Sequence, residues 1–247
     1  MKIALIGYGK MGKTIEQIAL RRGHQIVLRV DVNNSKYIDT SDLKGADVAI
    51  EFSRPDSAAE NIRKCFKAGV PVVCGTTGWY DQLDAISKDC KESAGSFFYA
   101  ANYSIGVNLF FEVNKKLAQL MNSQTQYDEV LIHESHHLEK LDSPSGTAIT
   151  IAQDVIDNID RVKHWVNYKT DESVTMGAES DGELPIFSTR EDEIPGTHIV
   201  KYFSDVDEIE IIHKALSRQG FAIGALTAAE WLQGKKGVFT MKDMLQL

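Results

Sequence analysis

The sequence of 247 residues has no long hydrophobic run and only three cysteines and five prolines. No stretch approaches the roughly 18 consecutive apolar residues of a membrane-spanning helix, and the apolar start is too short for a signal peptide. Cys65, Cys74 and Cys90 are odd in number and widely spaced, which indicates neither a disulfide framework nor a paired metal motif. We therefore expect reduced thiols in a cytoplasmic protein that has no membrane partner.

Basic residues are also in the minority, with 27 Lys and Arg against 35 Asp and Glu and a net charge of −8. Nucleic-acid binding depends on clustered basic residues, so a nucleic-acid partner is not expected. The 43% of hydrophobic and 25% of charged residues are ordinary for a globular protein and exclude long disorder. A chain of this length forms one large domain or two compact ones.

Strands and helices are predicted to alternate along the first hundred residues. Short apolar runs predict strands, and apolar positions at helical spacing predict the helices between them. The predicted strands are residues 2–6, 25–30, 47–50, 70–74 and 96–99, and the helices are residues 11–22, 56–68 and 80–93. This alternation implies βαβ units and an α/β fold, a Rossmann-type doubly wound parallel sheet.

The pattern changes after about residue 103, where strands follow one another through short turns. The predicted helices are residues 105–121 and 146–159, and the strands are residues 127–134, 184–190, 197–203 and 208–213. This order predicts a second, α+β domain with a mixed or antiparallel sheet. Residues from about 221 return to helical spacing and can fold back onto the first domain. We thus expect one domain of residues 1–103 and 216–247, with a second domain of residues 104–215 inserted.

A glycine motif, Gly7-Tyr8-Gly9-Lys10-Met11-Gly12, lies between the first predicted strand and helix. In such a motif the first glycine allows a tight turn, the second lets backbone approach a pyrophosphate, and the third packs helix on strand. The helix N-terminus offers N–H groups to the phosphates, so the anion is bound locally despite the net charge. The motif predicts a dinucleotide site, and its strand–turn–helix context argues against a glycine-rich turn without a ligand.

Asp31 closes the second predicted strand, about 20 residues after the glycines. An acid at this place can accept a hydrogen bond from the ribose 2′-hydroxyl, which favours NADH. Arg29 and Lys36 are close in sequence and could accommodate the 2′-phosphate of NADPH, so either cofactor remains open. The alternative is a solvated acid at a strand end.

His133-Glu134-Ser135-His136-His137 matches the H-E-x-x-H pattern of zinc proteases. That chemistry requires both histidines one turn apart on a helix. Val130-Leu131-Ile132 precede the motif and predict a strand, in which positions four apart lie ~13 Å from each other. We therefore expect no metal site.

Three histidines within five residues are followed by Lys140 and by Ser145-Gly146-Thr147, which open a predicted helix. Histidine can donate a proton near neutral pH, and lysine supplies a cation. Small residues and free N–H groups at a helix start suit a carboxylate. The loop is predicted to hold a small acidic substrate and protonate it; a polar surface loop with a capped helix is the alternative.

Residues 134–148 closely resemble the signature of the 4-hydroxy-tetrahydrodipicolinate reductase (dihydrodipicolinate reductase) family. The glycine motif is shared by many dehydrogenases, whereas the H-H-x-x-K loop followed by S-P-S-G-T is specific. The sequence departs from many relatives after Arg190, where they carry a glycine two residues later. The resemblance spans nearly the whole chain and includes residues 51–55, 74–78, 100–108, 196–198 and 213–218.

The resemblance implies that NADH or NADPH reduces 4-hydroxy-tetrahydrodipicolinate to tetrahydrodipicolinate, in diaminopimelate and lysine biosynthesis. It implies a dinucleotide-binding first domain and a second domain that binds substrate and joins a homotetramer. His136 would donate the proton, and Lys140 would act at the substrate nitrogen. The implied substrate-binding residues are His137, Ser145, Gly146 and Thr147. The implied lining of the nicotinamide site is Gly75, Thr76, Thr77, Ala100, Ala101, Asn102 and Tyr103.

Two other functions are compatible with parts of the sequence. Another two-domain NAD(P)-dependent amino-acid dehydrogenase, such as an aspartate or homoserine dehydrogenase, would share the glycine motif and the domain plan. A dinucleotide-binding redox sensor without turnover would share the motif alone. Neither needs the clustered histidines and Lys140 before a helix start, so both are less favoured.

Overall fold

The computed structural model describes residues 1–33, 39–169, 182–217 and 219–247. The chain divides into two compact units. Unit 1 comprises Met1–Asn108 and Gln219–Leu247, and unit 2 comprises Leu109–Arg218. The division expected from the sequence lies a few residues earlier at both connections.

Unit 1 is built on a parallel sheet of six strands in the order β11-β5-β4-β3-β1-β2. Its strands are β1 (Lys2–Ile6), β2 (Gln25–Val30), β3 (Val48–Glu51), β4 (Val72–Cys74), β5 (Ser96–Tyr99) and β11 (Gly237–Phe239). The chain passes from β1 to β2 on one side and then to β3 on the other, so the strand order reverses at β1. Ligands of doubly wound sheets bind outside the carboxyl ends of the strands at such a point. The predicted Rossmann-type fold is confirmed, whereas the short β11 was not predicted.

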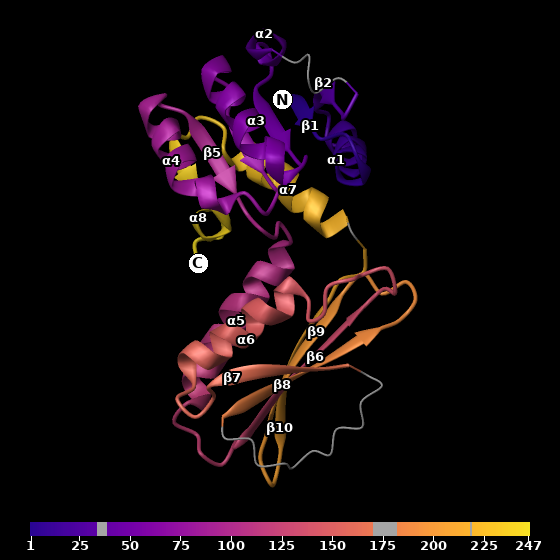
Figure 1. Ribbon diagram of the computed structural model, residues 1–247, viewed down its shortest axis with the longest axis vertical. Coiled ribbons are helices and arrows are strands. Elements are labelled where there is room, and N and C mark those ends of the chain that lie inside the picture. Colours follow the sequence, from indigo (N-terminus) through magenta and orange to yellow (C-terminus); the bar gives the residue numbers. More distant parts are fainter. Residues whose placement is uncertain (34–38, 170–181, 218) are drawn as a thin grey trace. The chain divides into compact units, whose positions relative to one another are not determined.

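Helices cover both faces of this sheet and bury two apolar cores. They are α1 (Lys10–Arg21), α2 (Thr40–Leu43), α3 (Pro55–Ala68), a 3₁₀ turn (Tyr80–Gln82), α4 (Leu83–Glu92), α7 (Gln219–Trp231) and α8 (Met241–Leu245). Ile15 and Ile18 of α1 share one core with Ala225 and Leu226 of α7. Figure 1 shows the same arrangement, since α7, near the end of the chain, lies beside the strands of unit 1. The predicted return of the residues after 221 is therefore observed.

Unit 2 contains a mixed sheet of five strands in the order β10-β9-β6-β8-β7. Its strands are β6 (Glu129–His136), β7 (His164–Lys169), β8 (Glu183–Arg190), β9 (Thr197–Phe203) and β10 (Glu208–Lys214). Antiparallel pairs join β6, β9 and β10, and parallel pairs join β6, β8 and β7. Helices α5 (Ile105–Met121) and α6 (Gly146–Asn158) contribute the apolar residues that bury one face (Figure 1). The predicted mixed α+β unit is confirmed, although β7 was not predicted.

Strand β6 continues two residues beyond its predicted end and includes His136, which we had expected in the following loop. Side chains two apart in a strand lie on the same face. Glu134 and His136 are therefore neighbours on the face that packs toward α6, and both are buried.

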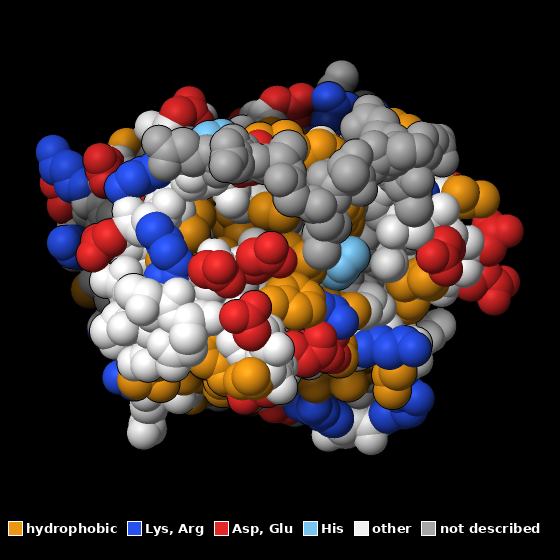
Figure 2. Space-filling view, turned by 90° about the horizontal axis from the view of Figure 1, so that it is seen from below, with side chains coloured by type: hydrophobic (Ala, Val, Ile, Leu, Met, Phe, Trp, Pro, Cys, Tyr) orange, Lys and Arg blue, Asp and Glu red, His pale blue; other side chains and the backbone are white. Residues whose placement is uncertain are grey.

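No helix in the described part of the chain is long and apolar enough to cross a membrane. Cys65, Cys74 and Cys90 are buried free thiols. Figure 2 shows apolar, acidic and basic side chains interspersed on the face in view, where the basic ones lie in separate groups.

Candidate functional site

The three glycines of the first motif differ in how much space surrounds them. Gly7 has φ of +95°, and a Cβ there would lie 1.9 Å from the carbonyl oxygen of Phe52. A Cβ on Gly12 would lie 2.3 Å from the carbonyl oxygen of Gly7. Gly9, the N-cap of α1, has no atom within 4 Å of a Cβ position. Open space in front of a helix N-terminus fits a phosphate group, so these residues suit the predicted dinucleotide.

The other side chains of the motif pack around this turn. The Tyr8 hydroxyl donates to the Glu16 carboxylate, which also accepts from Arg29 Nε at 3.0 Å. The hydrogen bond from Arg29, followed by that from Tyr8, lowers the pKa of Glu16. Lys10 is exposed in the first turn of α1, and Met11 packs against the core. Arg29 is thus held by an acid of α1.

Asp31 follows β2 directly, at the edge where the glycine turn lies after β1. Its Oδ1 accepts the backbone N–H of Asn33 at 2.7 Å, which fixes the carboxylate in a local turn. The predicted ribose contact would use this carboxylate, and Lys36, the other candidate for a 2′-phosphate, lies outside the described residues.

The buried carboxylate of Glu51 stabilises the turn after β4 by accepting a hydrogen bond from it. Thr76 Oγ1 donates to Glu51 at 2.7 Å and accepts the backbone N–H of Ser53 at 2.8 Å. Gly75 packs against Phe52, because a Cβ on Gly75 would lie only 2.1 Å from a ring carbon of that residue. Thr77 is exposed at the strand end. Thr76 therefore shapes the turn, and Thr77 is the threonine available to a ligand.

The segment after β5 also lies at the carboxyl edge of the sheet. The Tyr103 hydroxyl donates to the carbonyl oxygen of Cys74 at 2.7 Å, and burial raises the pKa of Tyr103 well above its usual range. Asn102 Oδ1 accepts the backbone N–H two residues later at 2.9 Å. Ala100 is buried and Ala101 is exposed. The strand ends of β1, β4 and β5 thus bring the predicted cofactor residues to one edge.

In unit 2, Glu134 is fully buried and faces His136 along β6. One carboxylate oxygen, Oε2, contacts His136 Nδ1, and the other, Oε1, accepts from Arg190 Nη2 at 2.9 Å and from the Ser145 backbone N–H at 3.3 Å. Burial alone would raise the pKa of Glu134, but hydrogen bonds from His136, Ser188 and Arg190 outweigh it and bring the pKa to about 2. Glu134 is therefore ionised at neutral pH.

Sheet register places two further residues in this network. Arg190 is the partner of His136 across β8, and His198 is the partner of Glu134 across β9. His198 Nε2 lies 3.0 Å from Ser145 Oγ, which accepts the N–H of Ala148 as the N-cap of α6. Burial, followed by the proximity of His136, lowers the pKa of His198 to about 3. His198 is therefore a neutral imidazole.

Glu134, His136 and His198 are a possible metal-binding group within the described residues, since their ligand atoms lie within 4.8 Å of one another. However, His136 and Arg190 already occupy both oxygens of the carboxylate. A cation would also lie near the Arg190 guanidinium, which repels it. The two oxygens therefore suit a hydrogen-bonded network with His136 and Arg190 better than a metal ion.

The zinc-protease pattern lies on a strand, where His133 and Glu134 point to opposite faces. The His133 ring stacks on Phe187 with centroids 5.0 Å apart. The motif thus lacks the helical arrangement that places two histidines on one zinc.

Lys140 lies in the loop between β6 and α6, and its Nζ donates to both oxygens of Asp142 at 2.8 Å. Burial alone would raise the pKa of Asp142, but the hydrogen bond from Lys140 outweighs it and lowers the pKa. Arg190 donates to the carbonyl oxygens of Lys140 at 3.3 Å and of Asp142 at 2.6 Å. Arg190 of β8 therefore fixes the loop, and the Lys140 ammonium group already binds the Asp142 carboxylate.

The first turn of α6 has space for an anion. Gly146 begins the helix, and no atom lies within 4 Å of a Cβ position there. Ser145 accepts the N–H groups of Ala148 and Ile149, through its hydroxyl and carbonyl oxygens respectively. Among the described groups this leaves the N–H of Gly146 and of Thr147 for a ligand. Ser145 itself is buried, so its side chain serves the helix and His198.

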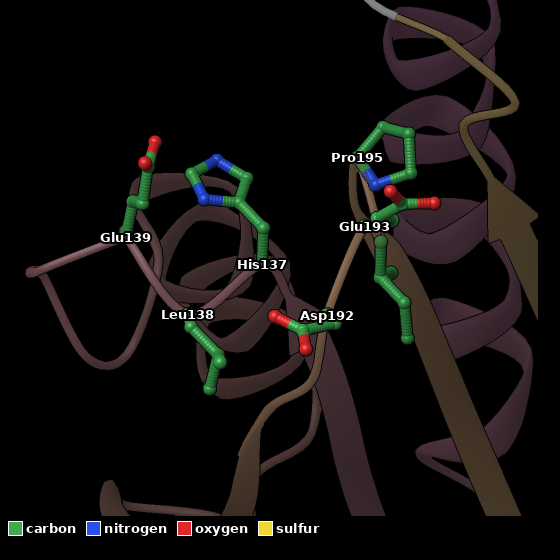
Figure 3. Close-up of a pocket in the computed structure, with 7 residues that line it drawn as sticks. His137, Leu138, Glu139, Asp192, Glu193 and Pro195 are labelled. Atoms are coloured by element: carbon green, nitrogen blue, oxygen red, sulfur yellow. The ribbon is translucent and has the colours of Figure 1, made fainter.

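A cavity of about 290 Å³ adjoins His137 (Figure 3). Two loops line it, one after β6 and one after β8, and the Asp192 carboxylate points toward the first loop. Its lining residues are His137, Leu138, Glu139, Asp192, Glu193, Ile194 and Pro195. Three acids line this cavity, so it is less suited to a carboxylate than the start of α6. Glu193 has φ of +63°, so this turn is made without the glycine of many relatives.

Replacing His198 with glutamine is expected to make the protein less sensitive to acid. Unfolded histidine titrates near pH ~6.5, whereas folded His198 titrates near 3. Below about pH 6.5 the unfolded chain binds a proton at this histidine and the folded chain does not. The free energy of unfolding therefore falls by about 1.4 kcal/mol for each pH unit below that value, and is unaffected by His198 above it. In urea unfolding at fixed protein concentration, we expect the wild type to lose about 2 kcal/mol more than His198→Gln between about pH 6.5 and about pH 5. Equal losses would show that His198 is not held neutral.

No role could be predicted from the sequence for Glu51, Glu134, Arg190 or His198. Of these residues, only Glu134 could have been placed from the sequence. It lies two residues before His136 in a predicted strand, and side chains two apart share a face. The others depend on strand pairing over long separations, such as the 56 residues between Glu134 and Arg190.

Comparison with known proteins gives matches over both units. Models of one family, described as "Dihydrodipicolinate reductase, N-terminus" and "Dihydrodipicolinate reductase, C-terminus", match residues 1–103 and 106–245. The chain is 50% identical over 245 residues to 4-hydroxy-tetrahydrodipicolinate reductase of Christiangramia forsetii, covering 99% of this chain and 98% of that protein. It is 34% identical to the protein of that name from Neisseria meningitidis, covering 94% of this chain and 84% of that protein. The fold resembles dipicolinate-bound dihydrodipicolinate reductase from Paenisporosarcina sp. TG-14, with a TM-score of 0.73 and 23% identity over 99% of both chains.

Proposed function

The chain belongs to the dihydrodipicolinate reductase family and is an NAD(P)H-dependent oxidoreductase, and we propose on this premise how its residues act. The reaction is reduction of 4-hydroxy-tetrahydrodipicolinate to tetrahydrodipicolinate, a step toward diaminopimelate and lysine. Residues of unit 1 bind NADH or NADPH, and residues of unit 2 bind the dicarboxylate substrate.

One observation carries the assignment of roles in unit 2. A single segment, from the end of β6 to the start of α6, presents His136, Lys140 and the free N–H groups of Gly146 and Thr147. A proton donor, a cation and a helix N-terminus are the groups that a substrate with two carboxylates and a ring nitrogen requires.

The open positions at Gly9 and Gly146 support two anion sites, one in each unit. At Gly9 the first turn of α1 would hold the dinucleotide phosphates, with Asp31 at the ribose. At Gly146 the first turn of α6, together with His137, would hold a substrate carboxylate. Both sites use backbone dipoles, which explains how a chain of net charge −8 binds two anions.

The chemistry that NADH or NADPH supplies when bound is a hydride for C4 of the ring, whose 4-hydroxyl leaves as water. The protein must then provide a proton and stabilise charge. His136 donates the proton to the ring carbon that has carbanion character. Lys140 leaves its ion pair with Asp142 and binds the substrate instead. There its ammonium group stabilises charge at the substrate's nitrogen and carboxylate.

Lys140→Ala is expected to lower kcat and to raise the KM for the dicarboxylate, because one ammonium group serves both turnover and binding. Steady-state kinetics at saturating cofactor measure both constants. The matched control is Lys64→Ala, which removes a surface ion pair with Glu60 at 3.0 Å and leaves both constants unchanged. Normal constants for Lys140→Ala would mean that this lysine is a loop cation bound only to Asp142.

We propose a homotetramer joined through the sheet of unit 2. Strand β10 lies at the sheet edge, and its side chains alternate between exposed and half-buried, which suits pairing with another copy. Light scattering of the purified chain tests this. The free thiols support a cytoplasmic location. The net charge of −8 supports an absence of nucleic-acid partners.

The test of the function is consumption of reduced cofactor with freshly generated substrate. NADH and NADPH are compared separately, and aspartate and homoserine are offered with NAD⁺ or NADP⁺ as rival substrates. Turnover of the dipicolinate-pathway substrate alone supports the proposal. Turnover of a rival substrate would favour another dehydrogenase, and cofactor binding without any turnover would favour a redox sensor.

A further inference from the structure

The fully buried Glu134 carboxylate lies beside His136, the proton donor of the proposed function, and has no assigned part in the reaction. We propose that Glu134 is a positioning residue that fixes the orientation and the tautomer of the His136 imidazole. This inference rests on the proposed role of His136. It concerns a residue that does not itself reach the substrate.

The two oxygens of Glu134 have different partners, and this difference sets the orientation of the carboxylate. Oε1 faces two groups that can only donate, the Arg190 guanidinium at 2.9 Å and the Ser145 N–H at 3.3 Å. Oε2 is left for His136 Nδ1. Because the carboxylate is ionised, it can only accept, so the proton of this contact resides on Nδ1.

A proton on Nδ1 determines which nitrogen serves the substrate. Nε2 points toward Gly196, where a Cβ would lie only 3.0 Å away and where φ is +151°. In the proton transfer, the Nε2–H bond breaks as a C–H bond forms at the substrate, and the electron pair stays on Nε2. The neutral imidazole that remains keeps its hydrogen on Nδ1 against Glu134, and solvent returns the proton to Nε2.

Glu134→Gln tests this arrangement with little change in volume. Arg190 and the Ser145 N–H require an acceptor, so the amide oxygen takes the place of Oε1. The amide NH₂ then faces His136 Nδ1 and forces it to accept, which moves the neutral imidazole's hydrogen to Nε2. The charge that stabilises an imidazolium is lost as well. The imidazolium that donates from Nε2 then lacks an acceptor for its Nδ1–H, so turnover should fall although the geometry is intact.

The experiment combines nitrogen NMR with kinetics. Proteins labelled with ¹⁵N-histidine are titrated from about pH 6 to about pH 10 without substrate, and His136→Gln assigns the signals. We expect the neutral His136 of the wild type to be protonated at Nδ1 and that of Glu134→Gln at Nε2. We expect kcat of Glu134→Gln to fall at least about 10²-fold with an unchanged Kd for the cofactor. An unchanged tautomer, or an unchanged kcat, would overturn the proposal.

Two further variants separate positioning from general stability. Glu134→Asp keeps an acceptor, so we expect it to keep the Nδ1–H tautomer and more activity than Glu134→Gln. Glu230→Gln alters a matched carboxylate–histidine contact in unit 1, where Oε1 lies 2.8 Å from His24 Nε2, and should leave kcat unchanged. The tautomer is measured without substrate, so failure of the proposed function would appear as an inactive wild type with the predicted NMR signals.

Discussion

His136→Gln is expected to lower kcat by ~10²–10⁴-fold, because glutamine has no proton to give at neutral pH. The Kd for NADH or NADPH should be unchanged, since the predicted cofactor residues belong to unit 1. Stopped-flow or steady-state oxidation of the reduced cofactor gives kcat, and fluorescence titration gives the Kd. The buried network should still fold, because glutamine fills most of the space of the imidazole.

The matched control is His133→Gln on the same strand. His133 lies on the opposite face of β6, stacked on Phe187, and has no part in the proposed reaction. Its replacement should change kcat by less than about threefold, as for a site away from the chemistry. If His136→Gln had the kcat of the wild type, another group would have to be the proton donor.

Gly7→Ala and Gly9→Ala are expected to act on different properties. Alanine at Gly7 would have an unfavourable positive φ and a Cβ 1.9 Å from the Phe52 carbonyl oxygen, so we expect a loss of about 2–4 kcal/mol of stability. Gly9 has φ of −83° and open space, so alanine at this N-cap should cost at most about 1 kcal/mol of stability, less than at Gly7. Its methyl group would occupy the space in front of α1 and raise the cofactor Kd at least about 10-fold.

Urea unfolding and cofactor titration of both variants measure these two effects separately. The signature of a phosphate site is a stable Gly9→Ala protein with weak cofactor binding. Normal binding by that variant would place the pyrophosphate elsewhere and leave the glycine motif as a tight turn only. A Gly7→Ala protein as stable as the wild type would require that the turn shifts away from Phe52.

Most of unit 1 could be predicted from the sequence, because its strands are short apolar runs between amphipathic helices. The bounds of α5 were also predicted, since 17 residues give a long helical pattern. Strand β7 was missed because its residues are half-buried at a sheet edge and show little alternation. Strand β11 has three residues and pairs with β5 far away in the chain. Its formation depends on tertiary pairing that local patterns do not contain.

The candidate site was predictable where it depends on one segment of chain. The glycine motif and the loop from His136 to Thr147 each lie within a continuous stretch. The partners of His136 come from three strands, and the register that brings Arg190 and His198 beside β6 is a property of the folded sheet. Sequence spacing could indicate His136, the proposed proton donor, but not the buried groups that contact it.

The two connections between the units also affect how the chain can fold during synthesis. Helix α7 contributes Ala225 and Leu226 to the core that contains Leu5 and Ile15, yet it follows the whole of unit 2 in the chain. When the ribosome has made unit 2, helix α1 can already cover part of one face of the first sheet, but the residues of α7 that complete the core on that face have not yet been made. Domains usually fold from the N-terminus onward, but here the unit that begins first can complete its core only last. Unit 2, a continuous segment, can form its own core before unit 1 is finished.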